Sequence, residues 1–243
     1  VGGGPGMPGA VRLAAEAALR SGAGLVRVAT HADSATQVVA GRPEIMCLPV
    51  AGARELDDLL ENADGVVLGP GLGQSDWGRR LAARVLQSDL PLVVDADGLN
   101  LLAEAPQARG RWILTPHPGE AARLGQCTVA EIQAGRLAAA KGLAAQYDGV
   151  VVLKGAGTLV AEPGDRIPAV CDRGNPGMGT AGMGDVLSGV IGALLVQTGD
   201  ASLSARAGVL LHAMAGDAAV TDGERGLLAR DLMPHLRRLA NPE

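Results

Sequence analysis

Asp185 is the one acidic residue in the stretch GNPGMGTAGMGDVLSGVIGALL, residues 174–195. Five glycines precede it within eleven positions: Gly174, Gly177, Gly179, Gly182 and Gly184. Because glycine has no Cβ, consecutive backbone N–H groups can converge, and a helix starting near Met183 adds free N–H groups and a positive dipole end. The stretch therefore predicts a phosphate site.

The carboxylate of Asp185 would be repelled by a phosphate unless it takes part in chemistry. One such role is to accept a proton from a hydroxyl that attacks the phosphate. The alternative is that Asp185 is a first-turn acid favoured by the helix dipole, with the glycines forming a flexible loop.

Four further polar or glycine-rich motifs directly follow short apolar runs. They are GPGLG at 69–73, DADGLN at 95–100, TPHPGE at 115–120 and LKGAGT at 153–158. In open α/β sheets, ligands bind at the carboxyl ends of the strands. We therefore expect these four motifs to face one crevice, with the 174–185 loop closing it.

Each motif has a functional and a structural interpretation. Lys154 precedes a Gly-Ala-Gly turn, which is typical of a nucleotide-contacting hairpin or of an ordinary hairpin with a solvated lysine. Asp95 and Asp97 could hold Mg²⁺ or cap the next helix. Two prolines stiffen the loop around His117, which favours a ligand contact, and Glu120 is either a metal-side acid or a helix N-terminal charge.

The segment GPGMPG at 4–9 matches the pattern G-x-G-x-x-G and imitates a dinucleotide fingerprint, with Asp33 downstream. Prolines at Pro5 and Pro8 and the lack of a preceding strand argue against it. A plain tight turn is the alternative to a nicotinamide oxidoreductase site.

Short β-branched runs alternate with longer Ala/Leu-rich segments of helical spacing. We predict strands at 24–30, 45–49, 65–69, 91–95, 111–115, 150–154 and 157–161. We predict helices at 10–21, 54–62, 76–88, 98–104, 118–124, 128–146, 183–198 and 201–221. This alternation predicts an α/β fold with a parallel sheet covered by helices on both faces. A chain of 243 residues fits one such domain, residues 1–243.

Composition excludes several classes of protein. A net charge of -5 without a Lys/Arg run argues against a nucleic-acid partner. No apolar stretch approaches the roughly 20 residues that span a bilayer, so no membrane partner and a cytoplasmic location are expected. Cys47, Cys127 and Cys171 form no CxxC pair and predict neither a zinc site nor a disulfide framework. His212, on an apolar helix, is interpreted as a core histidine.

The order and spacing of these motifs resemble the ADP/ATP-dependent NAD(P)H-hydrate dehydratase family. The resemblance covers essentially the whole chain, from GAVRLAAEAALRSGAGLVRVAT through ILTPHPGEAARL to the glycine-rich loop. It implies a ribokinase-like, three-layer α/β/α fold with a mostly parallel central sheet. It also implies a short strand ahead of Val1, a homo-oligomer such as a tetramer, and an epimerase domain or partner in bacterial members.

The resemblance also implies site residues. The nucleotide-binding residues would be Lys154, Gly155, Ala156, Gly157 and Thr158 of the hairpin, and Asn175, Pro176, Gly177, Met178, Gly179, Thr180, Ala181, Gly182, Met183 and Gly184 of the loop. The hydrated dinucleotide would be held by Ala10, Gly73, His117, Pro118, Gly119, Glu120, Ala121, Ala122, Arg123 and Asp185. Glu120 is a candidate metal-side residue, by analogy with the Asn-x-x-Glu pattern of related sugar and vitamin kinases.

The activity implied is ADP-dependent dehydration of the S-epimer of hydrated NADH or NADPH, which restores the coenzyme and releases AMP and phosphate. Asp185 would be the catalytic base and Mg²⁺ would accompany the nucleotide. ADP rather than ATP as the donor rests on resemblance to bacterial members alone. A small-alcohol kinase of the same fold and a nucleotide-sensing module without turnover are the alternatives.

Overall fold

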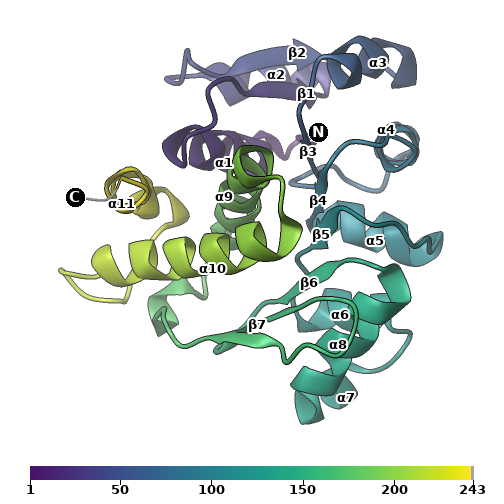
Figure 1. The fold of residues 1–243 in the computed structure, drawn as a ribbon. Helices are drawn as coiled ribbons and strands as arrows, with labels where there is room; N and C mark the ends of the chain where they lie inside the picture. The colour runs from purple at the N-terminus through teal and green to yellow at the C-terminus, as the bar shows by residue number, and fades with distance from the viewer. Residues whose placement is uncertain (242–243) are drawn as a thin grey trace.

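Two sheets run through the structure, a computed structural model that describes residues 1–241 (Figure 1). The larger sheet has the strand order β3-β4-β5-β6-β7-β8, and β1 and β2 form a separate pair. The strands are β1 (Arg27–Thr30), β2 (Met46–Pro49), β3 (Val66–Leu68), β4 (Leu92–Val94), β5 (Trp112–Leu114), β6 (Val150–Leu153), β7 (Thr158–Ala161) and β8 (Ala169–Cys171).

Helices connect most of the strands. They are α1 (Pro8–Arg20), α2 (Ala32–Val39), α3 (Ala53–Glu61), α4 (Asp76–Leu86), α5 (Ala96–Glu104), α6 (Pro118–Leu124), α7 (Val129–Ala134), α8 (Arg136–Tyr147), α9 (Met183–Thr198), α10 (Ala201–Ala218) and α11 (Met233–Leu239). Short 3₁₀ turns lie at Pro176–Met178 and Ala229–Leu232.

The larger sheet is parallel from β3 to β6, and β7 and β8 are added antiparallel. Its central strands are continuously apolar because both of their faces are covered. On β4, Val93 packs with residues of α9 and α10, whereas Leu92 and Val94 belong to the core on the opposite face. The predicted α/β arrangement, with helices on both faces of a mostly parallel sheet, is therefore confirmed.

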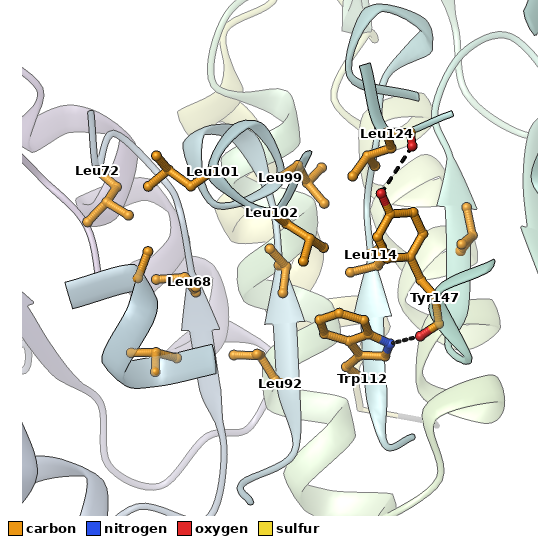
Figure 2. Packing of buried hydrophobic residues seen from close by; sticks show 14 of the residues in the cluster. Leu68, Leu72, Leu92, Leu99, Leu101, Leu102, Trp112, Leu114, Leu124 and Tyr147 are labelled. Atoms are coloured by element: carbon orange, nitrogen blue, oxygen red, sulfur yellow. Dashed lines mark hydrogen bonds between the residues drawn. The ribbon is translucent and has the colours of Figure 1, made fainter. Parts of the chain in front are cut away.

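Leucine is the commonest residue of the core on that opposite face, and Trp112 and Tyr147 lie beside its leucines (Figure 2). The Trp112 indole N–H donates to the Tyr147 carbonyl (2.9 Å), and the Tyr147 hydroxyl donates to the Leu124 carbonyl (3.0 Å). Both buried polar atoms thus have partners, which a buried aromatic needs. These bonds tie α6 and α8 to β5.

Several predicted element boundaries were wrong. The single helix predicted at 128–146 is two helices, α7 and α8, that meet at Gly135, whose φ of -139° and ψ of 51° are not helical. Helices α2 and α11 and strand β8 were not predicted. Most predicted strands end one residue late, because the residue after each strand already turns into the next loop.

Strands β1 and β3 belong to different sheets and are not paired with each other, and a gap lies between them. Val1 lies at one end of this gap: its amine donates to the Val67 carbonyl (2.7 Å), and its carbonyl accepts from Gly69 N–H (3.0 Å). The Gly2 N–H donates the other way, to the Ala29 carbonyl of β1 (3.1 Å). The rest of the gap is an apolar groove of about 490 Å³ between α1 and α9 on one side and α3 on the other.

Among residues 1–241, no helix has the length and apolar character needed to span a bilayer.

Candidate active site

The carboxyl ends of β3, β4, β5 and β6 lie along one edge of the larger sheet, since these strands are parallel. The four predicted motifs at 69–73, 95–100, 115–120 and 153–158 follow these ends. The start of α9 reaches the same place, because a Cβ at Gly184 would lie 3.2 Å from the Lys154 ammonium. The predicted convergence of the motifs is confirmed by the geometry.

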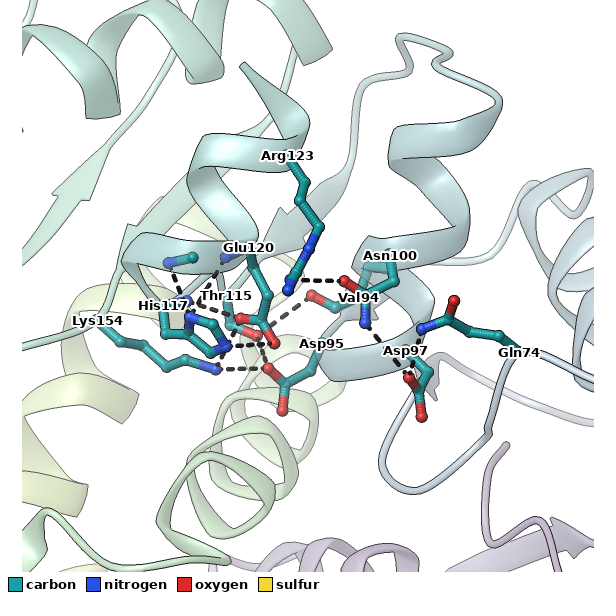
Figure 3. A network of polar contacts seen from close by, with 11 residues as sticks. Gln74, Val94, Asp95, Asp97, Asn100, Thr115, His117, Glu120, Arg123 and Lys154 are labelled. Carbon is teal, nitrogen blue, oxygen red and sulfur yellow. Dashed lines mark hydrogen bonds and ion pairs between the residues drawn. The ribbon is translucent and has the colours of Figure 1, made fainter. Parts of the chain in front are cut away.

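The ammonium group of Lys154 is the centre of a buried charge cluster (Figure 3). It lies 2.8 Å from the Asp95 carboxylate and 3.6 Å from that of Glu120. Asp95 is 1% exposed, and the Thr115 hydroxyl also donates to it (2.8 Å). Burial lowers the pKa of Lys154, but Asp95, Glu120 and Asp185 raise it by more, so its pKa lies above the ordinary value. Lys154 is therefore charged at neutral pH.

His117 and Glu120 form the start of α6. The Glu120 carboxylate accepts from the His117 N–H (2.7 Å), and His117 Nδ1 accepts from the N–H groups of Gly119 (2.9 Å) and Glu120 (3.3 Å). His117 Nε2 lies 3.3 Å from the other Glu120 oxygen. This reciprocal capping fixes both side chains, and Glu120 is 5% exposed.

Glu120 does not fit the role of a metal ligand in this arrangement. Its oxygens already face His117 and Lys154. The described residues also contain no group of three or more His, Cys, Asp or Glu side chains placed to hold a metal ion. We therefore assign no protein ligand to Mg²⁺.

A second chain of hydrogen bonds joins the GPGLG loop to α6. The Asp97 carboxylate accepts from Gly73 N–H (2.8 Å) and from the Asn100 amide (3.3 Å), and Asn100 Oδ1 accepts from Arg123 (3.0 Å). Ala10 also lies here, because a Cβ at Gly71 would be 3.0 Å from the Ala10 methyl. The structure thus brings Ala10, Gly73 and Arg123 to one side of the candidate site.

Asp185 lies in the first turn of α9, where its side chain is partly buried. Burial is the largest cause that raises its pKa, to about 7, and the nearby carboxylates of Asp95, Glu120 and Asp97 add to it. Lys154 opposes this shift. A carboxyl group with a pKa near 7 is matched to proton transfer at neutral pH.

Arg136, at the start of α8, binds the backbone of the hairpin at 154–158. Its guanidinium donates to the carbonyls of Ala156 (2.5 Å), Leu153 (3.3 Å) and Lys154 (3.4 Å). The Thr158 hydroxyl donates a hydrogen bond to the Gly155 carbonyl (2.9 Å), across the turn. Arg136 was not singled out from the sequence, because an arginine at the start of a helix is ordinary.

The glycine-rich loop starts at Gly174, passes through a 3₁₀ turn at Pro176–Met178 and reaches Gly182, the residue before α9. Gly182 has φ 90°, a conformation that disfavours side chains, and a Cβ there would lie 2.7 Å from Leu13. The loop start at Gly174 is bonded to Asp217 of α10, a residue that no sequence signal indicated.

Some predicted site residues lie elsewhere. The methyl groups of Ala121 and Ala122 belong to the hydrophobic core, so only their backbone could face a ligand. His212 is 8% exposed, and burial lowers its pKa to about 4, which fits the interpretation as a core histidine. Asp95 and Thr115 also lie in the site, where both contact the charge cluster of Lys154. The sequence located them at strand ends, but it left the role of Asp95 open and indicated none for Thr115.

Comparison with known proteins gives consistent matches along the chain. The family model described as NAD(P)H-hydrate dehydratase matches residues 1–238. A bifunctional NAD(P)H-hydrate repair enzyme Nnr from Coxiella burnetii is 55% identical over 243 residues, which is 100% of this chain and 50% of that protein. An ADP-dependent (S)-NAD(P)H-hydrate dehydratase from Neisseria meningitidis is 42% identical, over 99% of this chain and 83% of that one.

A solved structure is also similar. The ADP/ATP-dependent NAD(P)H-hydrate dehydratase from Bacillus subtilis, co-crystallised with ATP/Mg²⁺ and soaked with CoA, has a TM-score of 0.85 and 31% identity, over 98% of this chain and 88% of that one. A ribokinase-like superfamily protein from Enterococcus faecalis has a TM-score of 0.89 and 28% identity, over 98% of this chain and 84% of that one, which confirms the predicted ribokinase-like fold. The chain spans about half the length of the bifunctional relatives that it matches.

Proposed function

The chain belongs to the NAD(P)H-hydrate dehydratase family, and on that premise we propose that it dehydrates the S-epimer of hydrated NADH or NADPH, using a phosphoryl group from ADP. The observation that carries the proposal is Asp185, a carboxyl group with a raised pKa at the start of α9, beside a loop suited to phosphate. This combination fits proton abstraction from a hydroxyl that attacks a phosphate.

The proposed reaction starts at the hydroxyl group on the carbon next to the ring nitrogen of the hydrate. Asp185 accepts the hydroxyl proton as the oxygen attacks the terminal phosphorus of ADP, and the bond from that phosphorus to the bridging oxygen breaks to release AMP. The ring nitrogen's electron pair then expels the phosphorylated oxygen as phosphate, which leaves an iminium ion. Loss of a proton from the neighbouring ring carbon to water then restores the ring double bond of the coenzyme. The products are NADH or NADPH, AMP, phosphate and a proton. The hydroxyl oxygen of the hydrate ends in the released phosphate.

Charge stabilisation is assigned to the loop and to Lys154. Free N–H groups at the start of α9 and a fixed ammonium would both face a phosphoryl group placed beside Gly184. The hairpin Lys154–Thr158 and the loop Asn175–Gly184 are proposed to hold the nucleotide. Ala10, Gly73 and the segment His117–Arg123 are proposed to hold the hydrated coenzyme.

Mg²⁺ enters the proposal only as an ion carried by the nucleotide. The solved relative was co-crystallised with ATP/Mg²⁺. Mg²⁺ commonly binds through substrate phosphates and water with few protein ligands. This agrees with the contact between the Glu120 carboxylate and the Lys154 ammonium, which leaves Glu120 unsuited to bind the ion.

The rate of the reaction should depend on pH through Asp185. The base must be ionised, so kcat/KM is expected to rise as the pH increases through about 7 and to level off above it. The free energy of unfolding should change in the opposite direction. The pKa of Asp185 in the folded protein lies above the ordinary value of 3.8, so raising the pH from about 4 to about 7 ionises this group more readily in the unfolded chain. The folded protein should therefore lose stability over that range. A pH–rate profile with Asp185→Asn as the control measures the first effect. A profile that is flat from pH 6 to 8 would contradict it.

We also propose that the domain comprises residues 1–243 together with one further strand in the groove between β1 and β3. Residues 1 and 2 already bond alternately to β3 and β1, as a central strand does. The edges of β1 and β3 that border the groove have no strand partner within residues 1–241.

Extending the chain ahead of Val1 by six alternating Val and Ile residues tests this proposal. The extension should raise the Tm by at least about 5 °C, because it pairs two open sheet edges and fills the apolar groove. Six Gly-Ser residues at the same position are the matched control. Equal Tm values for the two extended chains would contradict the proposal.

The activity is tested by absorbance in the reduced-nicotinamide band, with the protein, Mg²⁺ and hydrated NADH mixed with ADP or ATP in separate cuvettes. A nucleotide-dependent rise with release of phosphate is the expected result and identifies the donor. A stable phosphorylated product without a rise would indicate a small-alcohol kinase instead.

An upstream epimerase partner, homo-oligomerisation and a cytoplasmic location stay predictions.

A further inference from the structure

The glycine-rich loop is bound at its start by one carboxylate of α10. Asp217 Oδ2 accepts from the Gly174 N–H (3.0 Å), and Oδ1 accepts from the Asn175 side-chain amide (3.2 Å). One side chain therefore fixes both a backbone group and a side chain of the first two loop residues. Hydrogen bonds to a charged acceptor are stronger than those between neutral groups.

Another residue of α10 contacts the loop further along. A Cβ at Gly216 would lie 2.3 Å from the Met178 sulfur, so the 3₁₀ turn of the loop packs against bare helix backbone. Gly216 and Asp217 are consecutive residues near the end of α10, so this part of the helix contacts both the start and the turn of the loop.

We propose that α10 is the positioning element of the nucleotide site, with Asp217 fixing the start of the loop and Gly216 its turn. This inference rests on the proposed function, in which the loop holds the nucleotide. The loop needs such support because its glycines lose more conformational entropy on ordering than other residues. Asp217 does not contact the reacting atoms and is a positioning residue.

Replacement of Asp217 tests the proposal by direct nucleotide binding. We expect Asp217→Ala to weaken the calorimetric Kd for Mg·ADP by about 10-fold, because two charge-assisted hydrogen bonds are lost and the loop must be ordered on binding. Asp217→Asn keeps an acceptor for Gly174 and should lose less. The KM for hydrated NADH and the kcat at saturating ADP should change by less than about 2-fold, because the base and the coenzyme side of the crevice are untouched.

A matched control is Asp165→Ala, which removes an exposed carboxylate from the loop between β7 and β8. It should leave the Kd for Mg·ADP unchanged. Asp217 is itself exposed, so its replacement opens no cavity in the core. Gly216→Ala is an independent second variant, because its added methyl group would displace the Met178 side chain, with the same expected direction for Kd.

The outcomes separate the two proposals. An unchanged Kd in Asp217→Ala overturns the positioning role, and so does a loss of kcat with Kd preserved. If the wild-type protein binds Mg·ADP but never converts hydrated NADH, the proposed activity fails while the Kd values still decide the role of α10. If the wild-type protein binds neither Mg·ADP nor Mg·ATP, both proposals fail.

Discussion

Asp185→Asn should abolish the dehydration of hydrated NADH while the protein stays folded and still binds nucleotide. General base catalysis contributes about 10²–10⁴-fold, so kcat should fall by at least about 100-fold. Asparagine has the same shape but cannot accept the hydroxyl proton. The measurement is kcat from the absorbance rise at saturating ADP, together with the calorimetric Kd for Mg·ADP.

Thermal stability distinguishes this role from that of a helix-capping acid. If Asp185 only stabilised the start of α9, its replacement would lower the Tm and leave turnover largely intact. The raised pKa predicts the reverse at pH 8: the ionised carboxylate is disfavoured in the folded state, so Asp185→Asn should melt no lower than the wild type.

Asp76→Asn is the matched control for this comparison. Asp76 is also a first-turn acid, in α4, but it is exposed and lies outside the candidate site. Its replacement should leave kcat unchanged and lower the stability slightly, if at all. A turnover of Asp185→Asn above a tenth of the wild-type value would contradict the assignment of the base.

The sheet could be predicted because its strands are buried on both faces. Runs such as Val150–Leu153 are continuously apolar and β-branched, and glycine or proline follows closely, so their type and order were clear from the sequence. Helix α2 was missed because its sequence, ADSATQVV, is short and largely polar. The break at Gly135 between α7 and α8 was missed because an isolated glycine is tolerated inside a helix.

The candidate site was predicted as a set of motifs but not as a set of contacts. Parallel strands place their carboxyl ends at one edge, which is why Asp95, His117 and Lys154 could be expected near one another. Which atoms meet depends on packing between distant segments. Lys154 and Asp95 are 59 residues apart, and Asp217 is 43 residues from Gly174, so no local pattern could reveal either pair.

Lys154→Met should both destabilise the protein and stop turnover. Lys154 is the ammonium that faces Asp95, Glu120 and Asp185, and the carboxylate of Asp95 is almost fully buried. Removing one partner of a buried ion pair costs about 3–5 kcal/mol, because the remaining charge is left without compensation. The free energy of unfolding at pH 8, measured by urea denaturation, should fall by about 3 kcal/mol.

Lys141→Met is the natural control, since Lys141 is the chain's other lysine and lies on α8. It forms no ion pair within the described part of the chain, so its stability should stay within about 0.5 kcal/mol of the wild type. A similar loss in both methionine variants would mean that the charge cluster is not the cause.

The double variant Asp95→Asn with Lys154→Met separates the structural from the catalytic part of this effect. It removes both charges of the 2.8 Å pair, so it should recover at least half of the stability that Lys154→Met alone loses. Turnover should not recover, because no ammonium would remain to stabilise the charge on a phosphoryl group beside Gly184. If turnover returned together with stability, Lys154 would hold the fold of the crevice and take no part in the chemistry.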